Sequence, residues 1–135
     1  MLMHNIIRFI GDDFRLEGKI NAIPYVPNME ENTQHIKGEF KGATAVVGYS
    51  EFMKEFAVRY SGEDDLEEEY ISIAVQDFLN QHNGLFSMEL SKTHDIEIEL
   101  TATDGRKIDV DTTLYYLYIL PVEFTFGVIY FCFSL

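Results

Sequence analysis

Residues 63–84 read "EDDLEEEYISIAVQDFLNQHNG", and this stretch decides the fold. Acidic side chains fill its first turns, where they complement the positive end of a helix dipole. Apolar residues then recur at the spacing of one buried helical face, namely Ile71, Ala74, Val75, Phe78 and Leu79. The pattern predicts a long amphipathic helix, and Gly84 is the expected stop signal at its end.

A shorter helix is predicted just before the long one. Ser50 is placed to cap it, residues 52–60 ("FMKEFAVRY") would form its body, and Gly62 follows as a stop signal. Upstream, residues 35–50 ("HIKGEFKGATAVVGYS") show short apolar runs separated by glycines. This pattern predicts one or two strands joined by tight turns.

The carboxyl-terminal half is predicted to be rich in strands. Residues 95–102 ("DIEIELTA") alternate strictly between polar and apolar, and Asp104-Gly105 is the expected hairpin turn. Residues 107–120 would form the returning strand, and residues 121–135 would complete the sheet. The predicted fold class is therefore α+β, with two long helices packed on a largely antiparallel sheet.

Length and charge limit the possible functions. A chain of 135 residues has the size of one domain, so residues 1–135 are expected to form a single domain. The formal net charge of −13 argues against nucleic acid as a partner, because phosphate neutralisation needs clustered Lys and Arg. Anionic membrane surfaces are disfavoured for the same reason. Cys132 is the one cysteine, and its apolar neighbours predict a small buried side chain.

The carboxyl-terminal apolar run is long enough to raise the alternative of a membrane span. Pro121 and Glu123 lie near its middle, and its residues are aromatic and β-branched, which favours two buried strands meeting near Pro121. The first residues lack a basic leader, a long apolar run and a small-residue cleavage site. We therefore expect a cytoplasmic protein without a membrane segment.

The long helix has a second, polar face. A rotation of 100° per residue places Asp77 and Asn80 away from the apolar stripe, together with Ile73 and Gly84. The alternative is an ordinary helix end, where amides and glycines are common. His82 falls close to the buried stripe and is expected to be packed rather than a ligand. The histidines show no metal-binding spacing, and the acidic run would fan around the helix start instead of converging on one ion.

At "DFLNQHNG", residues 77–84, the sequence resembles the CheC/CheX/FliY family of chemotaxis phosphatases. The helix signature of that family is Glu-x-x-Asn with a Gly four residues after the Asn, and Asp77, Asn80 and Gly84 stand at those positions. The resemblance covers residues 36–135, and the order of predicted elements is similar to that of a single-copy CheX-like domain.

The resemblance implies hydrolysis of the aspartyl-phosphate of a response-regulator receiver domain such as CheY. Asn80 would orient the attacking water, and Asp77 would pair with the receiver's active-site lysine. Ile73, Gln76 and Gly84 would contribute to the partner-binding face. No cofactor or metal of its own is expected, since Mg²⁺ would belong to the phosphorylated receiver domain. The family also implies a homodimer, which strands rich in aromatic residues would favour by leaving apolar surface to cover.

Three features depart from the family pattern. Asp77 stands where the family has Glu and is one methylene shorter, although the unrelated chemotaxis phosphatase CheZ also uses Asp. The strand after the motif lacks the expected Pro, and residues 1–18 replace the usual amino-terminal helix. Besides the phosphatase, two alternatives therefore stay open: a non-catalytic receiver-binding module, and a structural or oligomerising domain in which the Asp77–Asn80 pair is incidental.

Overall fold

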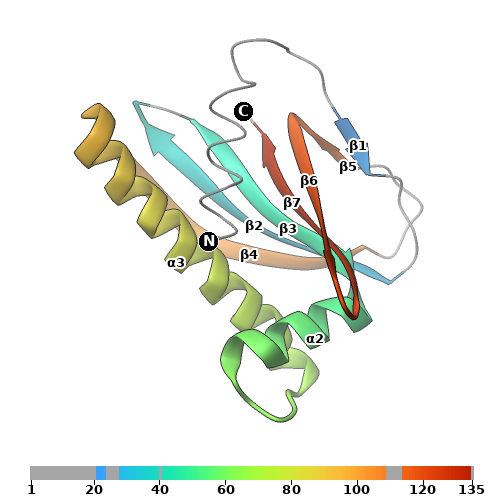
Figure 1. The fold of residues 1–135 in the computed structure, drawn as a ribbon. Coiled ribbons are helices and arrows are strands. Elements are labelled where there is room, and N and C mark those ends of the chain that lie inside the picture. Colours follow the sequence, from blue (N-terminus) through green and yellow to red (C-terminus); the bar gives the residue numbers. More distant parts are fainter. Residues whose placement is uncertain (1–20, 24–27, 40, 109–113, 135) are drawn as a thin grey trace.

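The computed structural model describes residues 21–23, 28–39, 41–108 and 114–134. Figure 1 shows the arrangement of its helices and strands. In chain order they are β1 (Asn21–Ile23), β2 (Met29–Gly38), β3 (Gly42–Tyr49), α2 (Ser50–Ser61), α3 (Glu68–His94), β4 (Ile98–Ile108), β5 (Leu114–Tyr116), β6 (Tyr118–Phe124) and β7 (Gly127–Ser134). The predicted amino-terminal segment, residues 1–18, lies outside the described residues.

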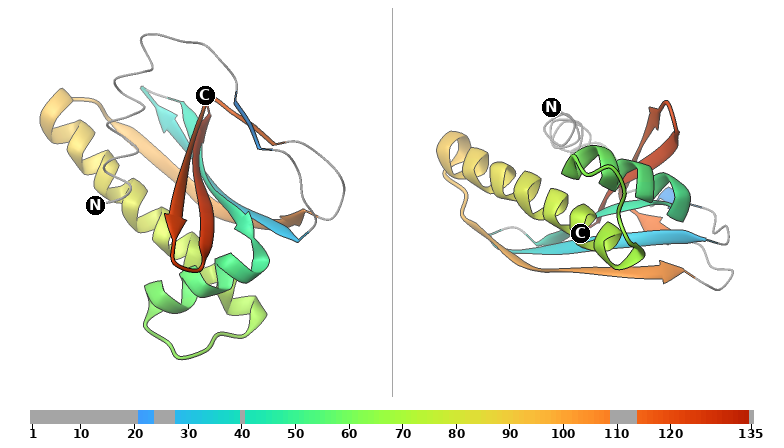
Figure 2. Two further views of the ribbon diagram at one scale, coloured as in Figure 1. Left: turned by 45° about the vertical axis from the view of Figure 1, so that its right-hand side comes forward. Right: turned by 90° about the horizontal axis from the view of Figure 1, so that it is seen from below.

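Five strands form one sheet in the order β4-β2-β3-β7-β6, and every neighbouring pair is antiparallel. Helices α2 and α3 lie on the same side of this sheet, as the two views in Figure 2 show. The short antiparallel pair β1–β5 forms a separate sheet. The α+β prediction, with two helices packed on a largely antiparallel sheet, is confirmed.

The central strand β3 contributes to a core on each face of the sheet, because successive side chains of a strand point to opposite faces. Val46 packs among the helices, whereas Ala45 and Val47 pack with residues of the β1–β5 pair. The thiol of Cys132 belongs to this second cluster and is 2 % exposed, as the sequence predicted. Burial raises the pKa of the Cys132 thiol well above its ordinary value, so it behaves as a buried apolar group.

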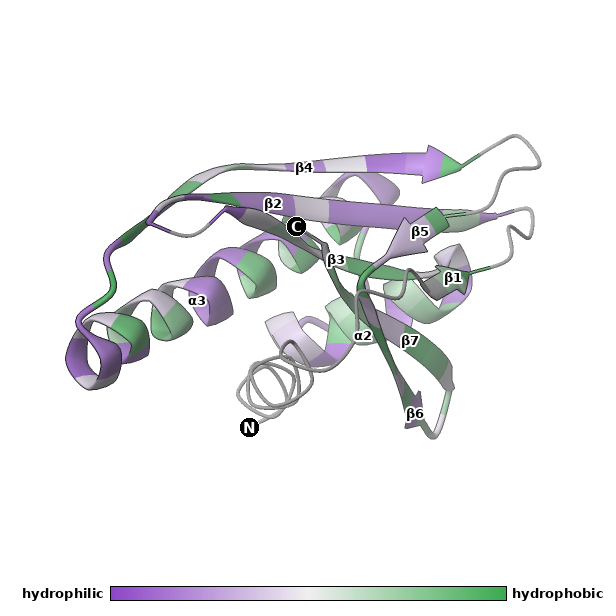
Figure 3. Ribbon diagram, turned by 90° about the horizontal axis from the view of Figure 1, so that it is seen from above, coloured by the Kyte–Doolittle hydropathy of each residue, from purple (hydrophilic) through white to green (hydrophobic). Residues whose placement is uncertain are grey.

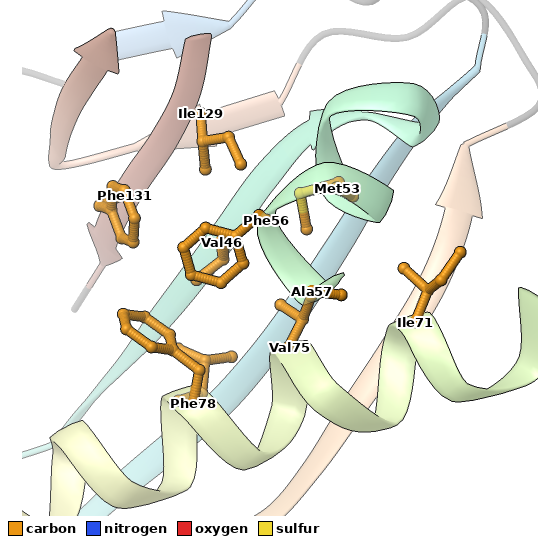
Figure 4. Packing of buried hydrophobic residues seen from close by; sticks show 10 residues of the cluster. Val46, Met53, Phe56, Ala57, Ile71, Val75, Phe78, Ile129 and Phe131 are labelled. Atoms are coloured by element: carbon orange, nitrogen blue, oxygen red, sulfur yellow. The ribbon is translucent and has the colours of Figure 1, made fainter. Parts of the chain in front are cut away.

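The larger apolar cluster joins the two helices to the sheet (Figure 4). The Phe56 and Phe78 rings pack edge to face with their centroids 5.0 Å apart, which fixes α2 against α3. The predicted buried stripe of α3 is confirmed, with Ala74 partly buried at its margin. The buried members are Val46, Met53, Phe56, Ala57, Ile71, Val75, Phe78, Leu79, Ile129 and Phe131.

The end predicted for the long helix is wrong. α3 runs from Glu68 to His94, so it passes through Gly84 and closes only at Asp95, which has a left-handed φ of 54°. Good helix formers such as Leu85, Met88 and Lys92 follow the glycine and carry the helix on. Consequently Asp77 and Asn80 lie in the middle of a regular helix, and the alternative of an ordinary helix end is excluded.

The hairpin turn predicted at Asp104-Gly105 is also wrong. β4 continues through both residues, and Gly105 pairs with Asn32 of β2. A Cβ at position 105 would lie closer than 3.0 Å to side-chain atoms of Asn32, Ser72 and Gln76. This glycine therefore makes room for polar groups between the sheet and α3. In the sequence alone, a glycine with this packing role looks the same as a glycine in a turn.

Two further boundaries differ from the predictions. Pro121 lies inside β6, the edge strand of the sheet, where a missing N–H is tolerated; the turn to β7 lies at residues 125–126. α2 begins at Ser50 itself, its N-cap is Tyr49, and no side-chain cap bond is formed. Gly62 ends α2 with φ of 78°, as predicted.

Among the described residues, no helix is long and apolar enough to cross a membrane.

Candidate functional site

A polar layer separates α3 from strands β2 and β4. α3 directs a second inward stripe toward these strands, formed at helical spacing by Ser72, Gln76, Asn80 and Asn83. β2 and β4 carry long hydrophilic stretches, whereas β3 and β7 are largely hydrophobic (Figure 3). The helix is thus held by apolar packing on one side and by hydrogen-bonded side chains on the other.

One group of this layer surrounds Gln76. Its Nε2 donates to Ser72 Oγ over 2.8 Å, and its Oε1 accepts a 2.9 Å hydrogen bond from Thr103 Oγ1. Ser72 Oγ in turn donates to Asn32 Oδ1 over 2.9 Å. The Gln76 side chain is therefore engaged with the sheet and does not join the outward residues with which the sequence grouped it.

A second group surrounds Gln34, which is fully buried in β2. Its Nε2 donates to Asn80 Oδ1 over 2.8 Å and to the Thr101 carbonyl over 2.9 Å. Its Oε1 accepts a 2.8 Å hydrogen bond from Asn83 Nδ2, which also lies 2.7 Å from Thr44 Oγ1. The exposed Asn80 is thereby tied to the interior of the sheet through one buried amide.

Asp77 is exposed on α3 and is held by a neighbour on α2. Tyr60 Oη and Gln81 Nε2 each donate to its Oδ2 over 3.0 Å. The Tyr60 ring packs edge to face on Phe78, with centroids 5.5 Å apart. Partial burial, together with the Asp77 carboxylate, raises the pKa of Tyr60 to about 12, so the phenol stays a donor at physiological pH.

Apolar side chains flank the Asp77–Asn80 pair along α3. Ile73 is 58 % exposed on the amino-terminal side of the pair, and Met88 is 53 % exposed on the other. A Cβ built on Gly84 would have no heavy atom of the described residues within 4 Å, so nothing in that part of the chain requires a glycine there. We call this surface the outward face of α3; it comprises Tyr70, Ile73, Asp77, Asn80, Gly84, Leu85 and Met88.

The structure brings together Ile73, Asp77, Asn80 and Gly84 on this outward face, as the helical rotation predicted. Exposed large apolar side chains beside a polar pair are typical of a surface that another protein covers. Because helix interiors disfavour glycine by about 1 kcal/mol relative to alanine, Gly84 lowers helix stability, and no contact with the described residues compensates for it.

Two residues that contact the pair were missed by the sequence reasoning. Gln34 lies 46 positions from Asn80, and Tyr60 lies 17 positions from Asp77, so neither is marked by local spacing. A weak signal did exist on α3 itself. Ser72, Gln76 and Asn80 recur every four residues, which places three polar side chains on one further face.

His82 is packed against the buried stripe of α3, as predicted. Its ring lies 4.3 Å from the Phe78 ring centroid, and its Nδ1 is buried without a hydrogen-bond partner among the described residues. Burial lowers the pKa of His82 below its ordinary value of 6.5, which favours the neutral imidazole. Within the described part of the chain, no three His, Cys, Asp or Glu side chains are grouped as metal ligands.

The fold is that of the CheX- and CheC-like chemotaxis proteins. The chemotaxis protein CheX of Desulfovibrio desulfuricans superposes with a TM-score of 0.66 over 99 % of each chain, at 15 % identity. CheX of Vibrio vulnificus gives 0.62 at 15 % identity, over 95 % of this chain and 93 % of the other. A CheC-like chemotactic protein of Shewanella oneidensis gives 0.62 at 15 % identity, over 98 % and 94 %. No family model and no curated protein matches the sequence.

Proposed function

We propose that this chain is a CheX-like phosphatase that hydrolyses the aspartyl-phosphate of a response-regulator receiver domain. The observation that carries the proposal is the outward face of α3. It presents an acid and an amide one turn apart in mid-helix, flanked by exposed apolar residues and by a glycine that meets no other side chain among the described residues. The CheX-like fold supports the same reading.

The chemistry requires positioning more than a reactive side chain. Water attacks phosphorus, a new P–O bond forms, and the bond from phosphorus to the receiver's aspartyl oxygen breaks, which leaves inorganic phosphate and a free carboxylate. The proton of the water passes to the phosphate oxygens. In this proposal the Asn80 amide orients the water, and the receiver supplies the Mg²⁺ that neutralises the developing charge.

In the same proposal, Asp77 pairs with a lysine of the receiver. Its carboxylate is already held at Oδ2, while Oδ1 accepts no hydrogen bond from the described residues. That oxygen is available to a cation on a docked partner. Apolar contacts from Ile73 and Met88 would exclude water around the pair and so strengthen the interaction.

A second candidate is a receiver-binding module without catalysis. Asp77 is one methylene shorter than the family's Glu, and Tyr60 and Gln81 hold it back on its own helix. If these contacts persist in the complex, the receiver would be bound but the water would not be aligned. The same outward face of α3 serves both candidates, so only turnover separates them.

We also propose a homodimer, which the resemblance implied and which aromatic-rich strands would favour by leaving apolar surface to cover. Most apolar side chains of β3 and β7 are buried within the chain, whereas Leu120, Val122 and Phe124 of the edge strand β6 are only partly buried. Pro121 in β6 impedes pairing with another strand, so a partner would cover these side chains and not extend the sheet. Light scattering at micromolar concentration tests this directly. A measured mass equal to that of one chain would contradict the homodimer.

The experiment that tests the phosphatase is phosphate release from receiver domains encoded in the same genome. Each receiver is loaded with Mg²⁺ and phosphorylated, and its decay is followed with the wild type, with Asp77→Ala and with Lys92→Ala. Lys92 is exposed on α3 beyond the outward face and serves as the matched control. Acceleration that is lost in Asp77→Ala and kept in Lys92→Ala supports catalysis. If the wild type binds the receiver but does not accelerate the decay, the chain is a receiver-binding module without catalysis.

A further inference from the structure

We propose that Gln34 is a positioning residue that fixes the orientation of the Asn80 amide, with Oδ1 turned to the sheet and Nδ2 left for the docked partner. This inference deepens the proposed function and rests on it for the catalytic consequence. The orientation itself follows from the hydrogen bonds of Gln34 alone.

The side-chain amide of Gln34 has a defined orientation. Oxygen and nitrogen of a side-chain amide are distinguished by their partners, and a backbone carbonyl can only accept. The atom 2.9 Å from the Thr101 carbonyl must therefore be the Gln34 nitrogen. The reverse orientation would place two acceptors at that distance, at the side chain of a fully buried residue.

The Gln34 amide in turn orients the side chain of Asn80. The Gln34 nitrogen lies 2.8 Å from the Asn80 side chain, so the Asn80 atom facing it must accept and is Oδ1. The other hydrogen bond of the Gln34 amide is consistent with this orientation, since Gln34 Oε1 accepts from Asn83 Nδ2. Three amides are thus oriented by one backbone carbonyl.

Asn80 presents its amide nitrogen on the outward face of α3. Its Oδ1 is committed to the interior, and its Nδ2 donates to no described residue. The group offered on the outward face is therefore a pair of N–H donors, which suits the anionic oxygens of a phosphoryl group and the oxygen of a water beside it. A freely rotating amide would present oxygen and nitrogen in turn, so Gln34 removes the unproductive arrangement in advance.

The test uses Gln34→Met, which has similar length but cannot hydrogen bond through an amide. Its matched control is Asn32→Leu, which removes another buried amide from the same strand and face without touching Asn80. We expect Gln34→Met to lower kcat about tenfold or more, with KM for the phosphorylated receiver within about twofold, while Asn32→Leu keeps kcat. Equal kcat values for the two variants, at matched folded fractions, would overturn the proposal.

A second measurement does not depend on activity, so it separates failure of this inference from failure of the proposed function. In the wild type, both side-chain NH₂ protons of Gln34 should exchange slowly with solvent in NMR spectra. Asn80→Asp keeps an acceptor, so both Gln34 protons should still exchange slowly. In Asn80→Ala, the Gln34 proton that faced Asn80 should exchange fast, while the Gln34 proton bonded to the Thr101 carbonyl stays slow. Fast exchange of both Gln34 protons in the wild type would contradict the proposed orientation of the Asn80 amide. So would a loss of slow exchange in Asn80→Asp as large as that in Asn80→Ala.

Discussion

Tyr60 Oη of α2 donates a 3.0 Å hydrogen bond to Asp77 Oδ2 of α3, and this bond joins the candidate site to the apolar core. The Tyr60 ring packs on Phe78, which belongs to the buried stripe of α3. The position of the exposed acid is therefore set by a buried aromatic contact. A loss of packing between the helices would release the Asp77 carboxylate from Tyr60 and leave Gln81 as its partner.

We predict that Tyr60→Phe lowers the free energy of unfolding by about 1 kcal/mol, the net value of one hydrogen bond. Because the folded state raises the pKa of Tyr60 from 10.0 to about 12, folding favours the neutral phenol. The resulting stability is complete below pH 10 and falls as the pH rises toward 12. Urea unfolding across this range, with phenolate absorbance, measures both effects. A wild type and a Tyr60→Phe variant with parallel pH profiles would refute the coupling.

Two glycines should respond oppositely to the same substitution. Gly105→Ala places a Cβ against Asn32, Ser72 and Gln76, so we expect a loss of about 1–3 kcal/mol of stability from overpacking. Gly84→Ala meets open space in a helix interior and should stabilise by up to about 1 kcal/mol. Urea unfolding of both variants provides the comparison. A Gly105→Ala protein as stable as Gly84→Ala would show that the polar layer is not tightly packed.

His82 should make the fold sensitive to mild acid. Burial lowers its pKa in the folded state below 6.5, so the unfolded chain takes up a proton first as the pH falls. The stability due to neutral His82 is complete above pH 6.5 and decreases as the pH falls toward the lower folded value. Urea unfolding from about pH 8 to about pH 5 should show a shallower decline for His82→Phe than for the wild type. Identical slopes would assign the acid sensitivity to the carboxylates.

Ile73→Glu should weaken receiver binding without destabilising the fold. Ile73 is 58 % exposed, so a charge there costs little in the free protein but would be buried beneath a docked partner. We expect at least a tenfold increase in Kd, about 1.4 kcal/mol, by calorimetry with a receiver held in its Mg²⁺–beryllofluoride form. Tyr115→Glu is the control, because Tyr115 is 64 % exposed on the small β1–β5 sheet. Equal affinities for both variants would remove the outward face of α3 as the docking surface.

The sequence predicted the features that depend on local periodicity. The buried stripe of α3, the outward positions of Asp77 and Asn80, and the left-handed stop at Gly62 all follow from helix geometry and were confirmed. The errors at Gly84 and Gly105 share one cause. A glycine signals a turn locally, but in this fold one lies in a helix interior and the other makes room for side chains from a distant element.

The partners of the site could not be predicted in the same way. Gln34 and Tyr60 reach Asn80 and Asp77 only because the sheet and α2 are folded against α3. For Gln76, the position predicted from local spacing was wrong. Helical rotation placed it near the outward residues, yet Ser72 and Thr103 hold its side chain toward the sheet.

The most direct test of the central claim is the decay of aspartyl-phosphate on a Mg²⁺-loaded receiver, with the wild type and with Asn80→Ala. We predict that the wild type accelerates the decay and that Asn80→Ala reduces the acceleration about a hundredfold, while binding of the receiver persists. Acceleration that survives in Asn80→Ala would contradict the role of the amide. Decay that the wild type leaves unchanged with every receiver of the genome would contradict the phosphatase itself.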